Sequence, residues 1–384
     1  MIIKNAKIYM DNCTFEEGNL IIKDGKFIAA GMTGATNSDA NQSEQAEDII
    51  DVSGLYAIPG LIDIHFHACD GKDFCDGTTE ALSTIAHYEA KNGITSICPA
   101  TMTLEATKLL GICKAASGFT AAPDEAALVG INLEGPFLSY EKRGAQNPKY
   151  LIPPNASLVR QLNEASGGIV KLVSLAPELP GATQFIHELK GEFTISAAHT
   201  TADYDTAKNA FDNGMRHVTH LYNAMPSFSH RAPGVIGAAF DAGNCNVELI
   251  CDGIHVAPSA VRMTFGLFGD DRIILISDTM MAAGLSDGAY TLGGQAVNVH
   301  GNLATLADGT IAGSVTNLFA CMTHAVNMGI PLESAVKCAT VNPAKAIGIY
   351  EKTGSITPGK DADLLLLNPD LSLHSVFVRG QKIV

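Results

Sequence analysis

Two histidines, His65 and His67, stand one residue apart at the end of a mostly apolar run, 61–67. Alternate side chains of a strand point to the same face, so both imidazoles can reach one point in space. Neutral imidazole is the commonest protein ligand of catalytic divalent metals. The pair is weak evidence alone, and it indicates a metal centre only if other segments bring further ligands to the same place.

Further residues of the metal-ligand type follow later apolar or β-branched runs, namely Glu134, His199, His220 and Asp278. Each has an ordinary structural interpretation, because a carboxylate can cap a helix and a single buried histidine can be satisfied in a core. Six such residues at strand ends are much harder to explain that way. Four histidines, a glutamate and an aspartate at one end of a set of strands predict a metal centre with a base beside it.

Residues of these types favour hydrolysis. Histidine and carboxylate ligands hold a divalent metal and leave a position for water, and the metal lowers the pKa of that water and polarises a substrate carbonyl. Asp278 follows the apolar run 273–277 and should therefore be rigidly placed. We predict that it takes the proton of the water and later delivers it to the leaving amine. The reaction class is metal-assisted hydrolysis of an amide or a related bond.

The elements that must position these residues alternate along the middle of the chain. Eight strand-like runs start 24 to 42 residues apart, at 61–67, 96–100, 127–135, 169–178, 193–200, 217–223, 246–255 and 273–280. Helix-like stretches such as 78–92 and 203–213 lie between them. Eight strand-plus-helix units predict a (β/α)8 TIM-type barrel over 56–345, with its chemistry at the carboxyl ends of the strands. A doubly wound open sheet is the weaker alternative, because no Gly-x-Gly-x-x-Gly follows a first strand.

Both ends of the chain resemble strands instead. Residues 19–29 carry Asp24-Gly25 between two apolar runs, which predicts a hairpin with a type I′ turn. Residues 363–367 and 375–378 are also strand-like. We therefore expect 1–55 and 346–384 to form one small β-sandwich domain built from both termini.

The amino-acid composition restricts the classes of function that the chain can have. The chain has 384 residues, 46% of them hydrophobic, and a net charge of −15, which argues against nucleic-acid binding and requires a local cationic pocket for any anionic substrate. No apolar run is long enough to span a membrane. The N-terminus lacks the features of a signal peptide, and nine cysteines without a Cys-x-x-Cys suggest reduced thiols, so we predict a cytoplasmic protein.

Beyond the ligand residues, several strings are similar to those of the amidohydrolase superfamily and, within it, of the N-acetylglucosamine-6-phosphate deacetylase family. They are spread along the chain: PGLIDIHFH at 59–67, LEGPF at 133–137, AHT at 198–200, THLYNAM at 219–225, HRAPG at 230–234, DGIH at 252–255, SD at 277–278, AGS at 312–314, ATVNPA at 339–344 and GKDADL at 359–364. The first and last strings are shared widely in the superfamily, whereas 133–137 together with 219–225 is specific to these deacetylases.

The resemblance implies deacetylation of N-acetyl-D-glucosamine 6-phosphate in amino-sugar catabolism. It implies metal ligation by Glu134, His199 and His220, a second metal position at His65 and His67, and Asp278 as base and then acid. Zinc fits these ligands best, while iron(II), cobalt and manganese are also compatible, with one or two ions per chain. Substrate contacts are implied for Ala145, Gln146, Asn223, Ala224, Arg231, His255, Ile311, Ala312 and Gly313.

The resemblance also implies a homodimer in which Arg231 reaches the neighbouring site and binds the 6-phosphate. Two positions depart from the family pattern. Gln146 stands where many members have histidine, and it cannot carry a proton; Ala232 stands where an acidic residue is common. Deacetylation of the galactosamine epimer and hydrolysis of a cyclic amide remain alternatives, as does a non-catalytic relative, although this chain keeps every ligand.

Overall fold

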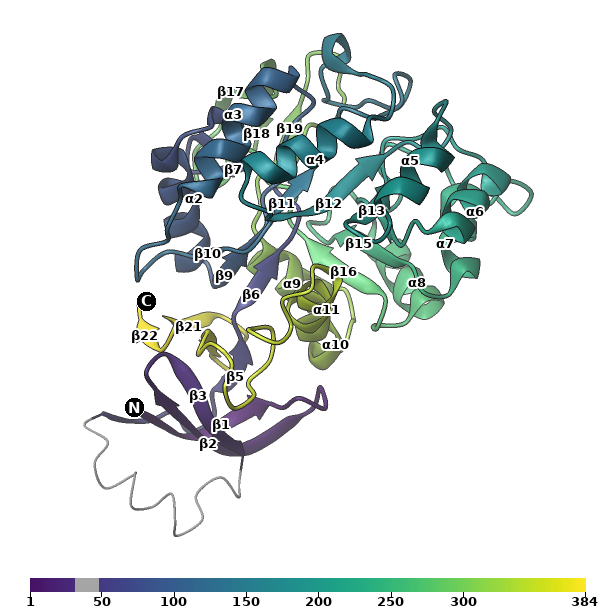
Figure 1. Cartoon of the computed structure of the whole chain (residues 1–384). Coiled ribbons are helices and arrows are strands. Elements are labelled where there is room, and N and C mark those ends of the chain that lie inside the picture. The colour runs from purple at the N-terminus through teal and green to yellow at the C-terminus, as the bar shows by residue number, and fades with distance from the viewer. Residues whose placement is uncertain (32–47) are drawn as a thin grey trace.

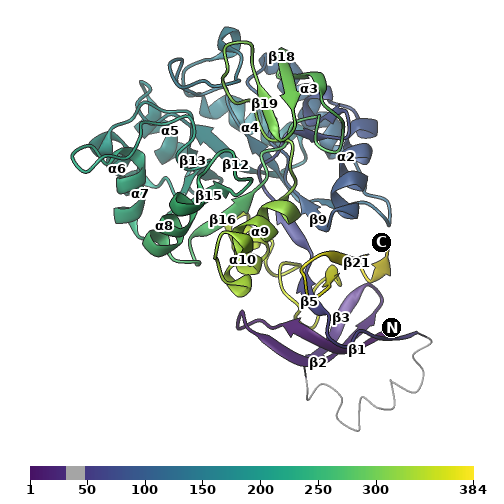
Figure 2. The ribbon, with the colours of Figure 1, turned by 180° about the vertical axis from the view of Figure 1, so that it is seen from behind.

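The computed structural model describes residues 1–31 and 48–384. It places a barrel of strands and helices above a smaller sheet that contains both termini (Figure 1). Seen from behind, the same two parts stay distinct, with strand β5 running from the small sheet toward the barrel (Figure 2).

Eight parallel strands form the barrel; seven lie within the predicted runs, and β9 starts two residues before the run 96–100 and overlaps it only at residues 96 and 97. They are β6 (Leu61–Asp63), β9 (Ile94–Ile97), β11 (Ile131–Leu133), β12 (Val170–Leu175), β13 (Thr194–Ala197), β14 (His217–Val218), β15 (Asn246–Ile250) and β16 (Ile273–Ile276). Strands β11 to β16 pair in chain order, and β6 pairs with β9. A bridge between Ala100 and Asn132 connects these two sets, and Asp278 N donates to His65 O at 2.9 Å where the last strand meets the first. The (β/α)8 prediction is confirmed.

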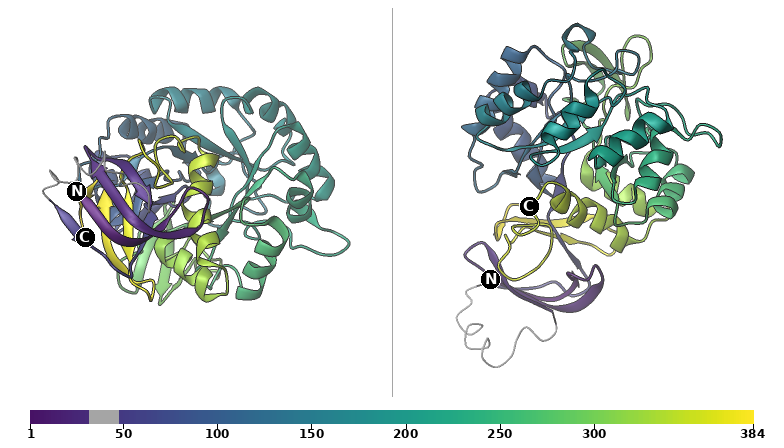
Figure 3. Two further views of the ribbon diagram at one scale, coloured as in Figure 1. Left: turned by 90° about the horizontal axis from the view of Figure 1, so that it is seen from below. Right: turned by 45° about the vertical axis from the view of Figure 1, so that its right-hand side comes forward.

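Helices surround the strands, as the view from below shows (Figure 3). They are α2 (Thr79–Lys91), α3 (Ala106–Ser117), α4 (Ala156–Ala165), α5 (Ala182–Leu189), α6 (Tyr204–Asn213), α7 (Gly234–Ala242), α8 (Pro258–Phe268), α9 (Leu318–Asn327), α10 (Leu332–Ala339) and α11 (Val341–Ala346). The predicted helices at 78–92 and 203–213 are confirmed; the Thr78 and Asp203 side chains accept from the backbone N–H three residues later. None of the described helices has the length and apolar character needed to cross a bilayer.

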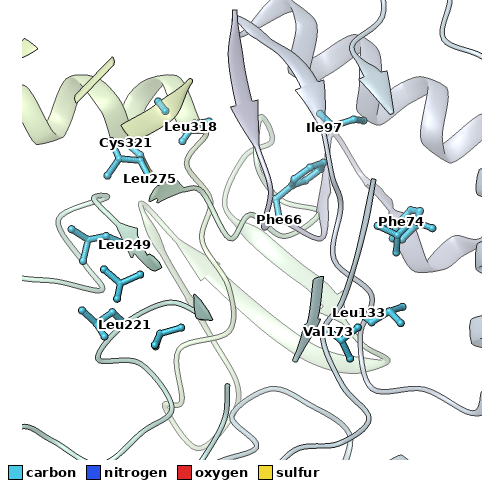
Figure 4. Packing of buried hydrophobic residues seen from close by; sticks show 14 of the residues in the cluster. Phe66, Phe74, Ile97, Leu133, Val173, Leu221, Leu249, Leu275, Leu318 and Cys321 are labelled. Carbon is cyan, nitrogen blue, oxygen red and sulfur yellow. The ribbon is translucent and has the colours of Figure 1, made fainter. Parts of the chain in front are cut away.

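Burial of the strands on both faces creates the core of the barrel. Strands β9 and β16 are buried at every position. Leu275 of β16 lies beside Leu318 and Cys321 of α9 in the layer between strands and helices (Figure 4). This rigid framework fixes the strand ends, where the candidate ligands begin.

The strands of the two termini pair into one mixed sheet with a core of its own. They are β1 (Ile2–Tyr9), β2 (Phe15–Lys23), β3 (Lys26–Gly31), β4 (Ile49–Asp51), β5 (Tyr56–Pro59), β20 (Leu364–Leu367), β21 (Leu373–Val378) and β22 (Gln381–Lys382). The order is β22-β21-β20-β5-β1-β2-β3, and β4 pairs with β1. In the β2–β3 turn, Asp24 and Gly25 have φ of 51° and 74°, so the predicted hairpin with two left-handed turn residues is confirmed. The division at 55/56 and 345/346 stays a prediction; β5 belongs to this sheet.

Smaller elements decorate the barrel. Strands β17 (Gly288–Leu292), β18 (Gln295–His300) and β19 (Leu303–Thr305) form an antiparallel sheet after β16, which the sequence analysis did not anticipate. The Gln295 side chain donates to Ala145 O at 2.5 Å, so this sheet packs against the loop after β11. Short strands β7 (Ala68–Cys69), β8 (Lys72–Asp73) and β10 (Ala127–Leu128) complete the set.

Candidate metal centre and cavity

All six predicted ligand and base residues meet at the carboxyl ends of the barrel strands. His65 and His67 follow β6, Glu134 follows β11, and the others follow β13, β14 and β16. They form two groups, in each of which the ligand atoms lie within 4.8 Å of one another. We call His65, His67 and Asp278 the first ligand group, and Glu134, His199 and His220 the second ligand group.

Glu134 lies between the two groups. Its Oε1 is 3.0 Å from His199 Nε2, 3.2 Å from His220 Nε2 and 3.4 Å from His65 Nε2. Its Oε2 is 3.1 Å from His67 Nε2. One carboxylate therefore contacts histidines of both groups, which is the placement needed to join two metal positions.

Three of the four histidines present their Nε2 atoms to this common centre with their Nδ1 atoms held from outside, whereas Nδ1 of His220 is buried without a hydrogen-bond partner among the described residues. Nδ1 of His65 lies 2.8 Å from Glu248, that of His67 lies 3.2 Å from Ala100 O, and that of His199 lies 2.9 Å from Lys142 O. Such outer hydrogen bonds fix the tautomer in which Nε2 has a free lone pair. His65 Nε2 is buried and has no hydrogen-bond partner among the described residues. The residues therefore fit a pair of divalent ions.

The surroundings of Glu134 and of Asp278 favour the ionised form of each carboxylate. Burial alone would raise the pKa of Glu134, but the charge of His65 and hydrogen bonds with His199 and His220 hold it well below its usual range. Burial likewise opposes ionisation of Asp278, while the hydrogen bond with His67 and the charge of His65 lower its pKa. A metal ligand and a general base both need this ionised form.

Three of these residues leave their strands in a left-handed backbone conformation. His199, His220 and Asp278 have φ of 43°, 30° and 51°. Side chains with a Cβ rarely adopt this region, and each instance costs on the order of 1–3 kcal/mol. The strained backbone conformation occurs at the ligand residues themselves, so the surrounding structure must stabilise it there.

A cavity of about 440 Å³ opens over the two groups. Seven of the predicted substrate residues line it, namely Ala145, Gln146, Asn223, Ala224, His255, Ile311 and Gly313. Ala312 is fully buried beside them and does not line the cavity. Lys142 and Arg143 also line it, although the sequence analysis did not single them out. They place positive charge at the cavity of a chain whose net charge is −15.

Both the nitrogen and the oxygen of the Gln146 side-chain amide form hydrogen bonds within the chain. Its Nε2 donates to Glu134 Oε2 at 2.7 Å, and its Oε1 accepts from Thr103 N at 2.7 Å. The side chain therefore restrains the Glu134 carboxylate as well as lining the cavity. Contact with the acetamide or a sugar hydroxyl stays a prediction.

His255 is held by an aspartate at the edge of the cavity. Its Nδ1 lies 2.7 Å from Asp252 Oδ2, and the same carboxylate accepts from the His255 backbone N–H at 2.9 Å. Burial would lower the pKa of His255, but the hydrogen bond and charge of Asp252 raise it. A protonated imidazole at this place suits an anionic or hydroxyl-bearing ligand.

Arg231 does not join the cavity of its own chain. It is exposed, lies outside the cavity lining, and forms no salt bridge with any described residue. The loop between β14 and α7 that carries it extends outward from the ring of helices (Figure 3). Its predicted phosphate contact thus requires a site other than the one formed by this chain alone.

Barrel fold and ligand groups together define a hydrolase class in which metals are bound at the mouth of a (β/α)8 barrel. Comparison with known proteins agrees, because residues 56–383 match the model of the amidohydrolase family. The chain is 35% identical to N-acetylglucosamine-6-phosphate deacetylase of Bacillus subtilis (strain 168), covering 99% of this chain and 96% of that protein.

Two further comparisons bear on the substrate. A solved structure of a mutant N-acetyl-D-glucosamine-6-phosphate deacetylase from Mycobacterium smegmatis, in complex with N-acetyl-D-glucosamine-6-phosphate, has a TM-score of 0.91 at 30% identity and covers 100% of this chain and 99% of that one. N-acetylgalactosamine-6-phosphate deacetylase of Escherichia coli O157:H7 is 33% identical, covering 84% of this chain and 86% of that protein. The chain belongs to the amidohydrolase family and, within it, to the N-acetylglucosamine-6-phosphate deacetylases.

Proposed function

We propose that this chain hydrolyses N-acetyl-D-glucosamine 6-phosphate to D-glucosamine 6-phosphate and acetate, a step of amino-sugar catabolism. The observation that carries the proposal is the pair of buried ligand groups at the floor of the cavity, in a chain that matches such deacetylases over its full length. Nine free cysteines, eight of them buried, suit a reducing compartment, and we place the reaction in the cytoplasm.

Glu134, His199 and His220 would hold one divalent metal, and His65 with His67 a second, with Glu134 between them. Asp278 belongs to the first ligand group together with His65 and His67, so it would contact the metal held there as well as act as a base. Zinc is the metal we propose, with iron(II), cobalt and manganese as substitutes. When bound, the metals supply a nucleophilic water at neutral pH and polarise the acetamide carbonyl.

The chain's own residues perform the proton transfers and the binding. Asp278 accepts the proton of the attacking water, and it then protonates the sugar nitrogen as the C–N bond breaks. His255, Asn223 and the backbone at Ala224 line the wall where sugar hydroxyls and the phosphate would lie. Ile311 and Gly313 also line the cavity.

The galactosamine epimer is a second candidate substrate, favoured by the E. coli O157:H7 relative. A cyclic amide is disfavoured, because enzymes of that group commonly use a carboxylated lysine at the end of the fourth barrel strand. Here the segment that follows β12, 176–178, contains no lysine, and Glu134 after the third strand offers the carboxylate instead. Glu178 in that segment accepts hydrogen bonds from Thr200 and Thr201. The Glu178 carboxylate therefore stabilises the loop that follows β13.

An acetate-release assay tests the proposal. Metal-reconstituted protein is given N-acetylglucosamine 6-phosphate, its galactosamine epimer and the two unphosphorylated sugars. We expect release from the first substrate at the highest kcat/KM. Acetate released faster from the epimer would change the substrate assignment, and no release from any of the four would contradict the deacetylase function.

Arg231→Ala is expected to lower kcat/KM for the 6-phosphate substrate roughly ten- to a hundredfold more than for unphosphorylated N-acetylglucosamine. Only the former offers an oxyanion to the guanidinium, and a charged hydrogen bond contributes about 1.5–3 kcal/mol. Arg262→Ala provides a control, because this exposed arginine lies on α8 outside the cavity lining. Equal losses on both substrates would indicate a structural role for Arg231.

We further propose a homodimer in which Arg231 enters the partner's cavity. Mixing Arg231→Ala subunits with inactive Asp278→Asn subunits should then restore activity, since the mixed dimer has one site with an intact Asp278 and a partner's intact arginine. Mixed dimers that form without any recovery would place Arg231 outside the neighbouring site.

A further inference from the structure

A buried carboxylate beneath the ligand groups has no part in the mechanism above. Glu248 lies in the middle of β15, between Val247 and Leu249, and is fully buried. Strand positions buried on both faces are normally apolar, because burying a charge is costly unless donors surround it. The burial of the Glu248 carboxylate therefore needs an explanation that is specific to this site.

Three donors surround it, and two come from the candidate metal ligands. His65 Nδ1 lies 2.8 Å from Oε2, and the backbone N–H of His220 donates to the same oxygen at 3.1 Å. His217 Nε2 lies 2.9 Å from Oε1. Glu248 thus contacts one member of the first ligand group and one of the second.

Its effect on His65 follows from histidine chemistry. A carboxylate oxygen can only accept a hydrogen bond, so His65 must carry its proton on Nδ1. In the neutral ring, the form that can bind a metal, Nε2 then has a free lone pair, and this is the atom that is buried without a hydrogen-bond partner beside Glu134. Without the carboxylate, the proton could move to Nε2 and block that position.

Its effect on His220 acts through the backbone. His220 follows the two-residue strand β14 and has φ of 30°, a conformation that requires support from its surroundings. The hydrogen bond from its N–H to Glu248 fixes the turn from which the imidazole reaches Glu134. One oxygen therefore holds the tautomer of one ligand and the backbone of another.

We propose that Glu248 is a positioning residue for both metal positions, and most strongly for the first ligand group. The inference rests on the proposed metal-dependent function. It predicts that Glu248 controls metal affinity without touching substrate, metal or the reacting atoms.

Glu248→Met tests this, because methionine has similar length and no carboxylate. Dissociation constants for zinc are measured by chelator competition, and metal per chain by elemental analysis. We expect the first group's zinc to bind on the order of 10–100-fold more weakly, as loss of an outer hydrogen-bond partner typically does. The second group's zinc should weaken less. The reference for losing the first position is the double variant His65→Gln, His67→Gln, which is expected to lower metal per chain.

Glu89→Met is the matched control. Glu89 on α2 is an equally buried glutamate whose carboxylate has no hydrogen-bond partner among the described residues. Its zinc affinities should equal those of the wild type, so a general loosening of the barrel would appear in both variants and a positioning effect only in Glu248→Met.

Glu248→Gln keeps the volume and one acceptor, so it serves if the methionine variant does not fold. Nitrogen-15 NMR of labelled histidines in metal-free protein should show a single Nδ1–H tautomer for His65 in the wild type and a mixture in either Glu248 variant. Unchanged zinc affinities and an unchanged His65 tautomer would overturn the proposal. Wild-type protein that binds no zinc and releases no acetate would instead contradict the proposed function.

Discussion

Asp278→Asn is expected to lower kcat for acetate release by about 10²–10⁴-fold while the second ligand group keeps its metal. Asparagine preserves shape but cannot accept the proton of the water, and general acid–base catalysis is typically worth this factor. Asp278 stands in an anionic state between His65 and His67, at 3.7 and 3.4 Å from their Nε2 atoms. Stopped assays for acetate and elemental analysis of the same samples measure the two quantities together.

Asp287→Asn is the control for this change. Asp287 lies at the start of the β17–β19 sheet and forms a salt bridge with the exposed His300, so its loss should leave kcat unchanged. A near-normal kcat in Asp278→Asn would remove this residue from the mechanism. Loss of metal from both groups would show instead that its main role is ligation.

Glu134→Ala is expected to abolish tight metal binding and activity together. The carboxylate contacts histidines of both ligand groups, so its removal takes a ligand from each position and leaves four imidazoles without their shared anion. His199→Ala should remove metal from the second group and also abolish activity. Metal per chain after dialysis is the measurement.

His187→Ala is a matched control for the histidine change, because His187 lies on α5 at the surface. It should retain metal and activity. Full metal occupancy in both Glu134→Ala and His199→Ala would contradict the ligand assignment, whatever their activity.

The regular alternation of buried strands with helices explains why the barrel could be predicted from the sequence. Each of the eight strands lies within or overlaps an apolar or β-branched run, since parallel strands covered by helices are buried on both faces. The same rule located the ligands at strand ends. The boundaries were less predictable: the run at 217–223 forms a strand only at His217–Val218, because His220 and Tyr222 adopt the left-handed backbone conformation.

Features of the structure that do not coincide with a buried apolar run could not be predicted from the sequence. The β17–β19 sheet has mostly exposed positions in β17, so it offered no buried run. Glu248 is the one acid within β15, and only the fold shows that three hydrogen-bond donors surround its carboxylate. The signal was present, because an acid within a strand buried on both faces needs partners. Arg231 lies outside the cavity lining of its own chain, and no local pattern of the sequence reveals this.

The small sheet has a consequence for how the chain is made. Strand β5 pairs with β1 on one side and with β20 on the other, and β20 is synthesised only after all the barrel strands. Until then one edge of β5 is an open template for other strands. Only Gly60 separates β5 from β6, the strand that leads to His65. A nascent or truncated chain therefore exposes an aggregation-prone edge directly beside the segment that must later bind metal.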